Sequence, residues 1–174
     1  PLNGMLSSLA FNYNHRNKNV RLYELAKVYL PKTLPLTELP DERVQFTMGM
    51  YGEGDFYVMK GVVEEFFSKA GIRGKMKGVI EEFLDKLGIT GRKSYRPNSG
   101  KTFLHPGRQA NIIYNGEVMG YLGEIHPQVA DNYGIGDKTY VAVLDMPVVV
   151  KYADFDRKFT GIARFPAVTR DLSM

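Results

Sequence analysis

The sequence predicts an α+β fold in which an antiparallel β-sheet is flanked by helices. Segments typical of strands occur in adjacent pairs, at residues 20–30 and 43–51 and again on either side of Asn115-Gly116. Amphipathic helical segments lie between these pairs. Neighbouring strands joined by short turns run antiparallel, so this order argues against a doubly wound parallel sheet.

The composition of the 174 residues is that of an ordinary folded domain, with 44% hydrophobic and 24% charged residues. The absence of cysteine excludes a disulfide scaffold, a thiolate metal site and a cysteine nucleophile, and it agrees with a reducing compartment. No apolar run approaches the roughly 20 residues needed to span a bilayer, and no signal peptide is visible. The net charge of +4 permits contact with nucleic acid, although solvated lysines are the commoner reason for such a balance.

The N-terminal half predicts a helix and two strands in order. Apolar residues at i, i+1, i+4 and i+5 indicate a short helix over residues 5–14. The polar stretch 12–19 that follows is either a phosphate-binding loop or, as we prefer, a solvated turn with asparagines in the left-handed conformation. Residues 20–30 are rich in strand formers and end at Pro31, and residues 43–51 alternate to give an antiparallel partner.

A helix is predicted after Asp55, whose carboxylate can cap the first turn. An apolar stripe from Met59 to Ala70 follows, and Gly71 stands where a helix-ending glycine belongs. The phrase at 59–72 recurs at 76–89 with ten of fourteen positions identical. Either the two copies form a helical hairpin, which we expect, or only one is a packed helix.

Residues 90–100 are basic and are predicted to be a loop. Asn115-Gly116 then marks a two-residue hairpin turn, the strongest local signal in the chain. With this turn, strict alternation places Ile112 opposite Met119 and Ala110 opposite Tyr121. Four further segments are predicted: a short helix at 128–133 ended by Gly134, a strand at 140–145, a helix or turn at 147–152, and an extended run at 158–162.

Charged and imidazole side chains gather at the base of this hairpin. His105-Pro106-Gly107-Arg108 comes at the start of the first strand, while Glu124 and His126 come at the end of the second. The guanidinium of Arg108 can hold the Glu124 carboxylate in a bidentate pair, which we interpret as a structural lock or subunit contact. In the alternative, His105, Glu124 and His126 bind a metal and form a metallohydrolase site, but each histidine can equally fix a turn, and we predict no metal site. No catalytic residue is assigned.

Five phrases, in order along nearly the whole chain, resemble the beta subunit of bacterial phenylalanine–tRNA ligase. Residues 20–29 are similar to VRLFEIGRVF in that family, and 55–64 to DFFDLKGVVE. Residues 105–110 resemble HPGRSA and 120–127 resemble GxxGELHP. Residues 165–173, FPAVTRDLS, resemble the FPAVRRDLS that opens the family's anticodon-binding domain. Each phrase alone is weak, but five in family order are specific.

The resemblance implies a class II aminoacyl-tRNA synthetase-like fold. It assigns residues 1–162 to a catalytic-like module without catalytic function, which packs against the alpha subunit of an α2β2 enzyme. It assigns 163–174 to the truncated start of a ferredoxin-like anticodon-binding domain. The whole enzyme joins phenylalanine to tRNA(Phe) in the cytoplasm with ATP and Mg²⁺, and we expect neither cofactor on this chain. The chain begins and ends within apolar phrases, so we expect a piece of a longer polypeptide.

Two departures from class II catalytic chains support the non-catalytic interpretation. Leu30-Pro31 stands where an ATP-binding arginine is expected after the strand, and the late glycine-rich motif ending in arginine is absent. The tandem copy at 76–89 departs from the family, which has one such helix. The runner-up hypothesis is an RNA-binding module that contacts tRNA through basic residues in two loops: Arg16, Lys18, Arg92, Lys93 and Arg96.

Overall fold

The computed structural model describes residues 1–72 and 93–154. The elements are α1 (Leu2–Asn14), β1 (Val20–Leu30), β2 (Asp41–Tyr51), α2 (Phe56–Lys69), β3 (Lys93–Pro97), β4 (Leu104–Tyr114), β5 (Glu117–Ile125), α4 (Pro127–Asn132), β6 (Thr139–Asp145) and α5 (Met146–Tyr152). The predicted second copy at 76–89, the extended run at 158–162 and the segment 163–174 lie outside the described residues.

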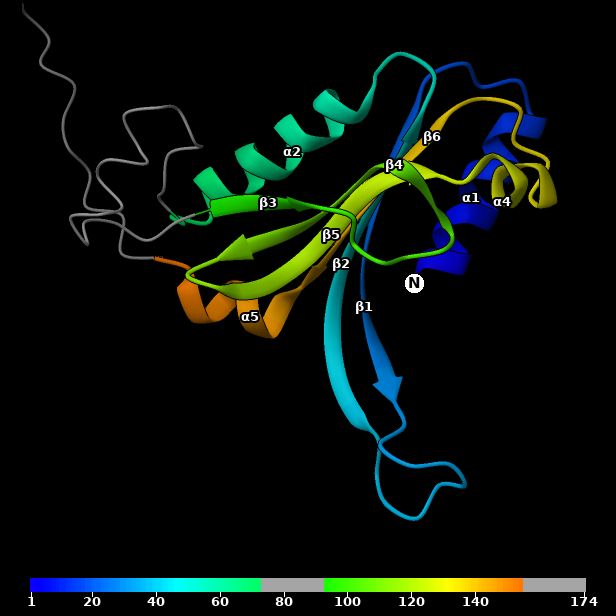
Figure 1. The fold of residues 1–174 in the computed structure, drawn as a ribbon. Coiled ribbons are helices and arrows are strands. Elements are labelled where there is room, and N and C mark those ends of the chain that lie inside the picture. The colour runs from blue at the N-terminus through cyan, green and yellow to red at the C-terminus, as the bar shows by residue number, and fades with distance from the viewer. Residues whose placement is uncertain (73–92, 155–174) are drawn as a thin grey trace, which may run out of the picture.

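The six described strands form one antiparallel sheet in the order β1-β2-β6-β5-β4-β3 (Figure 1). This confirms the predicted α+β class. One core lies between the sheet and helices α2 and α5, and the other lies between the sheet and helices α1 and α4. Strand β6 sits near the middle and is buried at every position from Thr139 to Leu144, because both of its faces are covered.

Helix α2 has the termini that its sequence predicts. The Asp55 carboxylate accepts a hydrogen bond from the backbone N–H of Val58 at 2.9 Å. At the other end Gly71 has φ +75°, the N–H of Ile72 donates to the carbonyl of Phe67, and the N–H of Gly71 donates to that of Ser68. These two bonds form a Schellman motif, and Ile72 is buried beneath it. Met59, Val63 and Phe67 make the buried stripe.

The hairpin turn and the pairing of Ile113 with Val118 are confirmed, but the predicted register beyond that pair is wrong. Asn115 and Gly116 have φ of 48° and 81°, and Tyr114 faces Glu117 as expected. A β-bulge then intervenes, so that Ile112 faces Gly120 rather than Met119, and Ala110 faces Leu122 rather than Tyr121. The extra residue reverses the faces of the following side chains. Leu122 therefore packs in the core beneath α2, and Tyr121 packs against the core beneath α1 and α4.

Two other predictions are corrected by the structure. Residues 93–97, expected to lie in a loop, form strand β3 at the sheet edge, because β4 offers them a free row of backbone groups. In the stretch 12–19 the non-glycine residue with a left-handed backbone is Arg16, at φ 62°, and not an asparagine. The helix–turn alternative at 147–152 resolves as helix α5, and the short helix after His126 is confirmed as α4.

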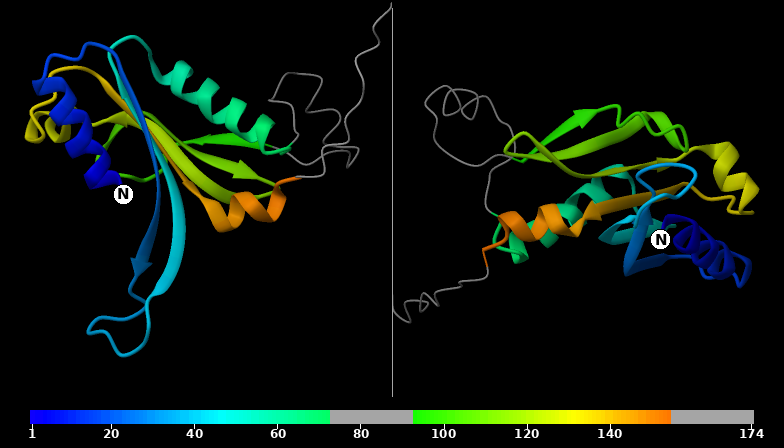
Figure 2. Two further views of the ribbon diagram at one scale, coloured as in Figure 1. Left: turned by 180° about the vertical axis from the view of Figure 1, so that it is seen from behind. Right: turned by 90° about the horizontal axis from the view of Figure 1, so that it is seen from below.

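The far end of the β1–β2 hairpin projects from the rest of the sheet (Figures 1 and 2). Beyond Val20 the side chains of β1 are exposed or half-buried, in contrast to those of β6. Within the described residues, none of the helices combines enough length and hydropathy to cross a lipid bilayer. The fold therefore has a doubly covered centre and a two-stranded arm.

Gly120 gives a test of the packing between β5 and β6. A methyl group there would collide with the carbonyl oxygen of Val143 and lie 3.0 Å from Leu144 Cα, whereas Gly61 on α2 has nothing within 4 Å. We expect Gly120→Ala to lower the free energy of unfolding by about 2 kcal/mol or more, since buried backbone must move. The control Gly61→Ala should raise it by roughly 0.5–1 kcal/mol. Urea unfolding of both variants measures the difference, and equal stabilities would contradict the packing described.

Candidate functional site

The base of the β4–β5 hairpin carries a wide irregularity in strand pairing. Leu104 pairs with Ile125 and Gln109 pairs with Gly123, so residues 105–108 bulge out opposite Glu124. Gly123 permits this course, because a Cβ there would lie 2.9 Å from the carbonyl oxygen of Arg108. The His-Pro-Gly-Arg sequence therefore forms a bulge whose last side chain reaches the opposite strand.

Arg108 and Glu124 form the ion pair predicted from the sequence, with both carboxylate oxygens close to the guanidinium but with a hydrogen bond to Oε1 alone. Arg108 Nε lies 2.6 Å from Glu124 Oε2, and Nη2 donates to Oε1 at 2.9 Å. The carboxylate is nearly inaccessible, with 3% of the side chain exposed, whereas 44% of the arginine side chain is exposed. Glu124 also lies opposite Tyr140 of β6, whose pKa is raised, first by burial and then by the charge of Glu124. The pair joins a buried charge to a cation at the surface.

The two histidines each hold a turn. His105 Nδ1 accepts a hydrogen bond from the N–H of Gly107 at 3.1 Å, and His126 Nδ1 accepts one from the N–H of Gln128 at 3.3 Å. His126 is thereby the cap of helix α4, which begins at Pro127. Among residues 1–72 and 93–154, no group of three or more His, Asp or Glu side chains is placed to hold a metal ion. The structure thus does not assemble the three ligands of the alternative hypothesis.

The basic residues named from the sequence do not come together. Arg16 and Lys18 precede β1 at one edge of the sheet, while Arg96 is exposed on β3 at the other. Lys93 begins β3, and Arg92 lies outside the described residues. The asparagines beside Arg16 bind the protein itself: Asn19 accepts from the N–H of Glu53 at 2.7 Å, and Asn17 donates to Asn12 at 2.8 Å.

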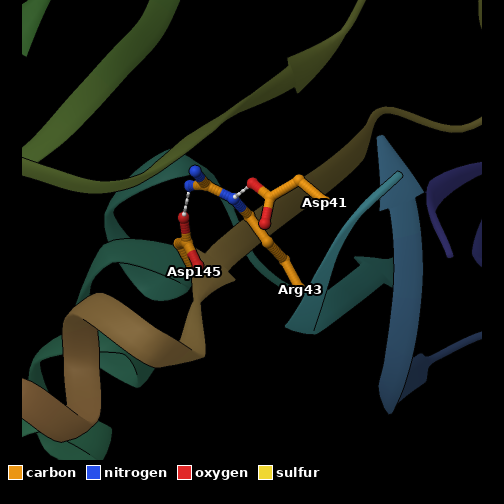
Figure 3. A network of polar contacts seen from close by, with 3 residues as sticks. All are labelled: Asp41, Arg43 and Asp145. Carbon is orange, nitrogen blue, oxygen red and sulfur yellow. Dashed lines mark hydrogen bonds and ion pairs between the residues drawn. The ribbon is translucent and has the colours of Figure 1, made fainter. Parts of the chain in front are cut away.

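A second polar cluster was missed by the sequence analysis (Figure 3). Arg43 Nε lies 2.6 Å from an oxygen of Asp41, and Nη1 lies 2.8 Å from an oxygen of Asp145. Hydrogen bonds to Asp41 and then to Asp145 raise the pKa of Arg43. Asp145 ends β6 and precedes α5, so the cluster ties β2 to that junction. Only the pairing of β2 with β6 brings Arg43 and Asp145 together, which local sequence does not reveal.

Exposed apolar side chains gather along the arm. Tyr23 is 76% exposed, and the loop residue Leu39 is 85% exposed. We call this set the arm surface: Tyr23, Leu25, Tyr29, Leu34, Leu36 and Leu39. It continues into an open apolar groove of about 210 Å³ between the arm and α2, lined by Tyr23, Phe46, Val62 and Phe66 among others. Phe46 and Phe66 stack there with ring centroids 5.0 Å apart. Such a patch is typical of a surface that another protein covers.

A family model described as the phenylalanyl tRNA synthetase beta chain CLM domain matches residues 2–146. The chain belongs to this family. A phenylalanine–tRNA ligase beta subunit of Clostridium tetani is 36% identical over 173 residues, which cover 99% of this chain and 20% of that protein. A phenylalanine–tRNA ligase beta subunit of Streptococcus thermophilus is 36% identical over 185 residues, which cover 99% of this chain and 21% of that protein. The chain spans about a fifth of the length of these curated relatives.

Comparison with solved structures shows what kind of fold this chain has. Two structures of pyrrolysyl-tRNA synthetase from Desulfitobacterium hafniense align with TM-scores of 0.51 and 0.52 at 11% and 9% identity. The alignments cover 86% and 84% of this chain, and 48% and 46% of the respective synthetase chains. At this identity the likeness concerns the fold alone. It confirms the predicted class II synthetase-like fold, and the family match confirms the resemblance to the beta subunit.

The Arg108–Glu124 pair can be tested as a structural lock. Arg108→Gln would leave the buried carboxylate without its cation, and we expect the free energy of unfolding to fall by about 2–3 kcal/mol. The double variant Arg108→Gln/Glu124→Gln should regain part of this loss, since no uncompensated charge remains.

Urea unfolding at neutral pH measures these changes. Lys27→Gln is the matched control, because it breaks the exposed pair with Glu42, at 3.3 Å, and should change stability by no more than about 0.5 kcal/mol. Equal effects of Arg108→Gln and Lys27→Gln would exclude the lock.

Proposed function

We propose that this chain is the catalytic-like module of a phenylalanine–tRNA ligase beta subunit and acts as a non-catalytic scaffold against the alpha subunit. The module comprises residues 1–162, and residues 163–174 begin a ferredoxin-like anticodon-binding domain. The enzyme is a cytoplasmic α2β2 ligase that attaches phenylalanine to tRNA(Phe). The family match and the names of the relatives support this assignment.

The arm surface is the observation that carries the scaffold role. Tyr23, Leu25 and Tyr29 lie at alternate or nearby positions of β1 and share the face of the sheet that carries Phe46. Their side chains are 57–76% exposed, and burying such apolar area contributes about 25 cal/mol per Å². β1 is also the outermost strand, so its outer backbone groups have no neighbour among the described strands. A large apolar partner such as the alpha subunit would cover this surface.

We assign ATP and Mg²⁺ to the whole enzyme and not to this chain. Mg²⁺ prefers carboxylate oxygens and water, and the described residues offer no cluster of such ligands. The buried carboxylate of Glu124 is already held by Arg108. At the end of β1, Leu30 and Pro31 supply neither charge nor, in the case of proline, a backbone donor for a nucleotide phosphate.

Subunit association tests the scaffold role. In the intact beta subunit, Tyr23→Asp/Leu25→Asp should weaken association with the alpha subunit by at least tenfold, because two charges would be buried in an apolar contact. The control Val118→Asp introduces one such charge at a position that is 50% exposed on β5 and should leave association unchanged.

Co-purification followed by analytical ultracentrifugation measures the subunit affinity. Unchanged assembly of the Tyr23→Asp/Leu25→Asp protein would exclude the arm as the contact. If the beta subunit itself loses solubility while subunit affinity is kept, the arm instead packs within the beta subunit.

Phenylalanine-dependent exchange of pyrophosphate into ATP tests the non-catalytic assignment. The beta subunit without alpha should show no exchange above background, and the assembled enzyme should show full exchange. Arg108→Gln and Arg43→Gln in the beta subunit should lower exchange only in proportion to the loss of assembled enzyme. Exchange by the beta subunit alone would overturn the assignment.

A further inference from the structure

A second pocket lies on the opposite flank of helix α2 from the apolar groove. It is bounded by the first turns of α2 and by strands β3 and β4, and its volume is about 340 Å³. This volume is at the low end of the range of small-ligand sites, which is roughly 300–1,000 Å³. The pocket can therefore hold one compact group, but not a long segment of a partner chain.

Aromatic side chains form two walls of this pocket. Phe56 and Tyr57 stand on α2 with ring centroids 5.9 Å apart and planes at 88°, and Tyr95 stands on β3. Tyr57 is 74% exposed although it borders a pocket, so a ring face is open to a ligand. Planar groups stack on such rings, and a base does so whatever its sequence.

The charged side chains that line the pocket are both cations. Lys60 Nζ lies 5.0 Å from the centroid of the Tyr95 ring, and Arg108 lies on the β4 side. Their carboxylate partners do not line the pocket: Glu64 is 3.7 Å from Lys60, and Glu124 is held behind Arg108. An anion in the pocket would therefore face two cations and no lining carboxylate.

We propose that this pocket binds one nucleotide, with its base against Tyr57 and Tyr95 and its phosphate on Lys60 and Arg108. The aromatic walls fit the planar part and the two cations fit the anionic part, and the pocket has room for one such unit. The inference rests on the proposed function, because a nucleotide of tRNA is then the nearest source. A free mononucleotide offers the same groups, and the experiment separates the two.

The test uses the intact ligase and a tRNA(Phe) transcript carrying 4-thiouridine. After irradiation, peptide mapping should place a cross-link on the segment with Tyr57 or on the segment with Tyr95. Tyr57→Ala should weaken tRNA binding by about tenfold, whereas Tyr57→Phe, which keeps the ring, should not. Lys60→Gln should lower the slope of log affinity against log salt by about one. The control Lys69→Gln removes an equal charge at the other end of α2 and should leave this slope unchanged.

Titration with AMP distinguishes the two sources of the nucleotide. If AMP competes with the cross-link, and this competition is lost in Tyr57→Ala, the result would support a free mononucleotide. A cross-link that AMP does not compete for, but that Tyr57→Ala removes, would support an RNA strand. The proposal is overturned if Tyr57→Ala and the unaltered enzyme bind both probes equally, or if cross-links fall only on other segments such as that of Arg16 and Lys18. Alpha–beta association, measured separately, shows whether the proposed function fails as well.

Discussion

The covering of strand β6 on both faces is the constraint on which the rest of this fold depends. A strand that is buried from Thr139 to Leu144 needs apolar side chains on both faces, and its neighbours must approach closely. Glycine permits close approach at two places: Gly120 on β5 lies against the β6 backbone of Val143 and Leu144, and Gly49 on β2 makes room for Leu9 and Met5 of α1. Because the two cores enclose the middle of the sheet, surface for partners is left at its two ends.

The elements could be predicted largely from local chemistry. Asp55 and Gly71 fix the ends of α2, Asn115-Gly116 fixes a turn, and His126-Pro127 fixes the start of α4, each through a bond or a dihedral angle within a few residues. Strand β3 was missed for the opposite reason. Its sequence KSYRP is polar and ends in proline, and only the free edge of β4 makes it a strand.

The candidate site shows the same division between local and long-range effects. The Arg108–Glu124 pair could be predicted, because the charges are complementary and a long arginine side chain in the irregular segment 105–108 can reach the strand opposite. The cross-strand partners of Met119 and Tyr121 could not, since one extra residue in a bulge shifts the register of every residue beyond it. The Arg43–Asp145 contact and the arm surface were missed because they depend on strand order. Nothing in residues 23–39 alone says that β1 is an edge strand or that its tyrosines remain exposed.

Helix α2 separates two surfaces of different chemistry. Its Met59, Val62 and Phe66 flank the apolar groove beside the arm, while Phe56, Tyr57 and Lys60 flank the aromatic and cationic pocket beside β3 and β4. The buried residues Val63 and Phe67 lie between the two sets and anchor the helix to the sheet. No residue lines both surfaces, so each can be altered separately, through Tyr23 on one side and Tyr57 on the other. A protein partner at one end of the sheet and a nucleotide at the other could therefore be held together, with α2 as the common wall.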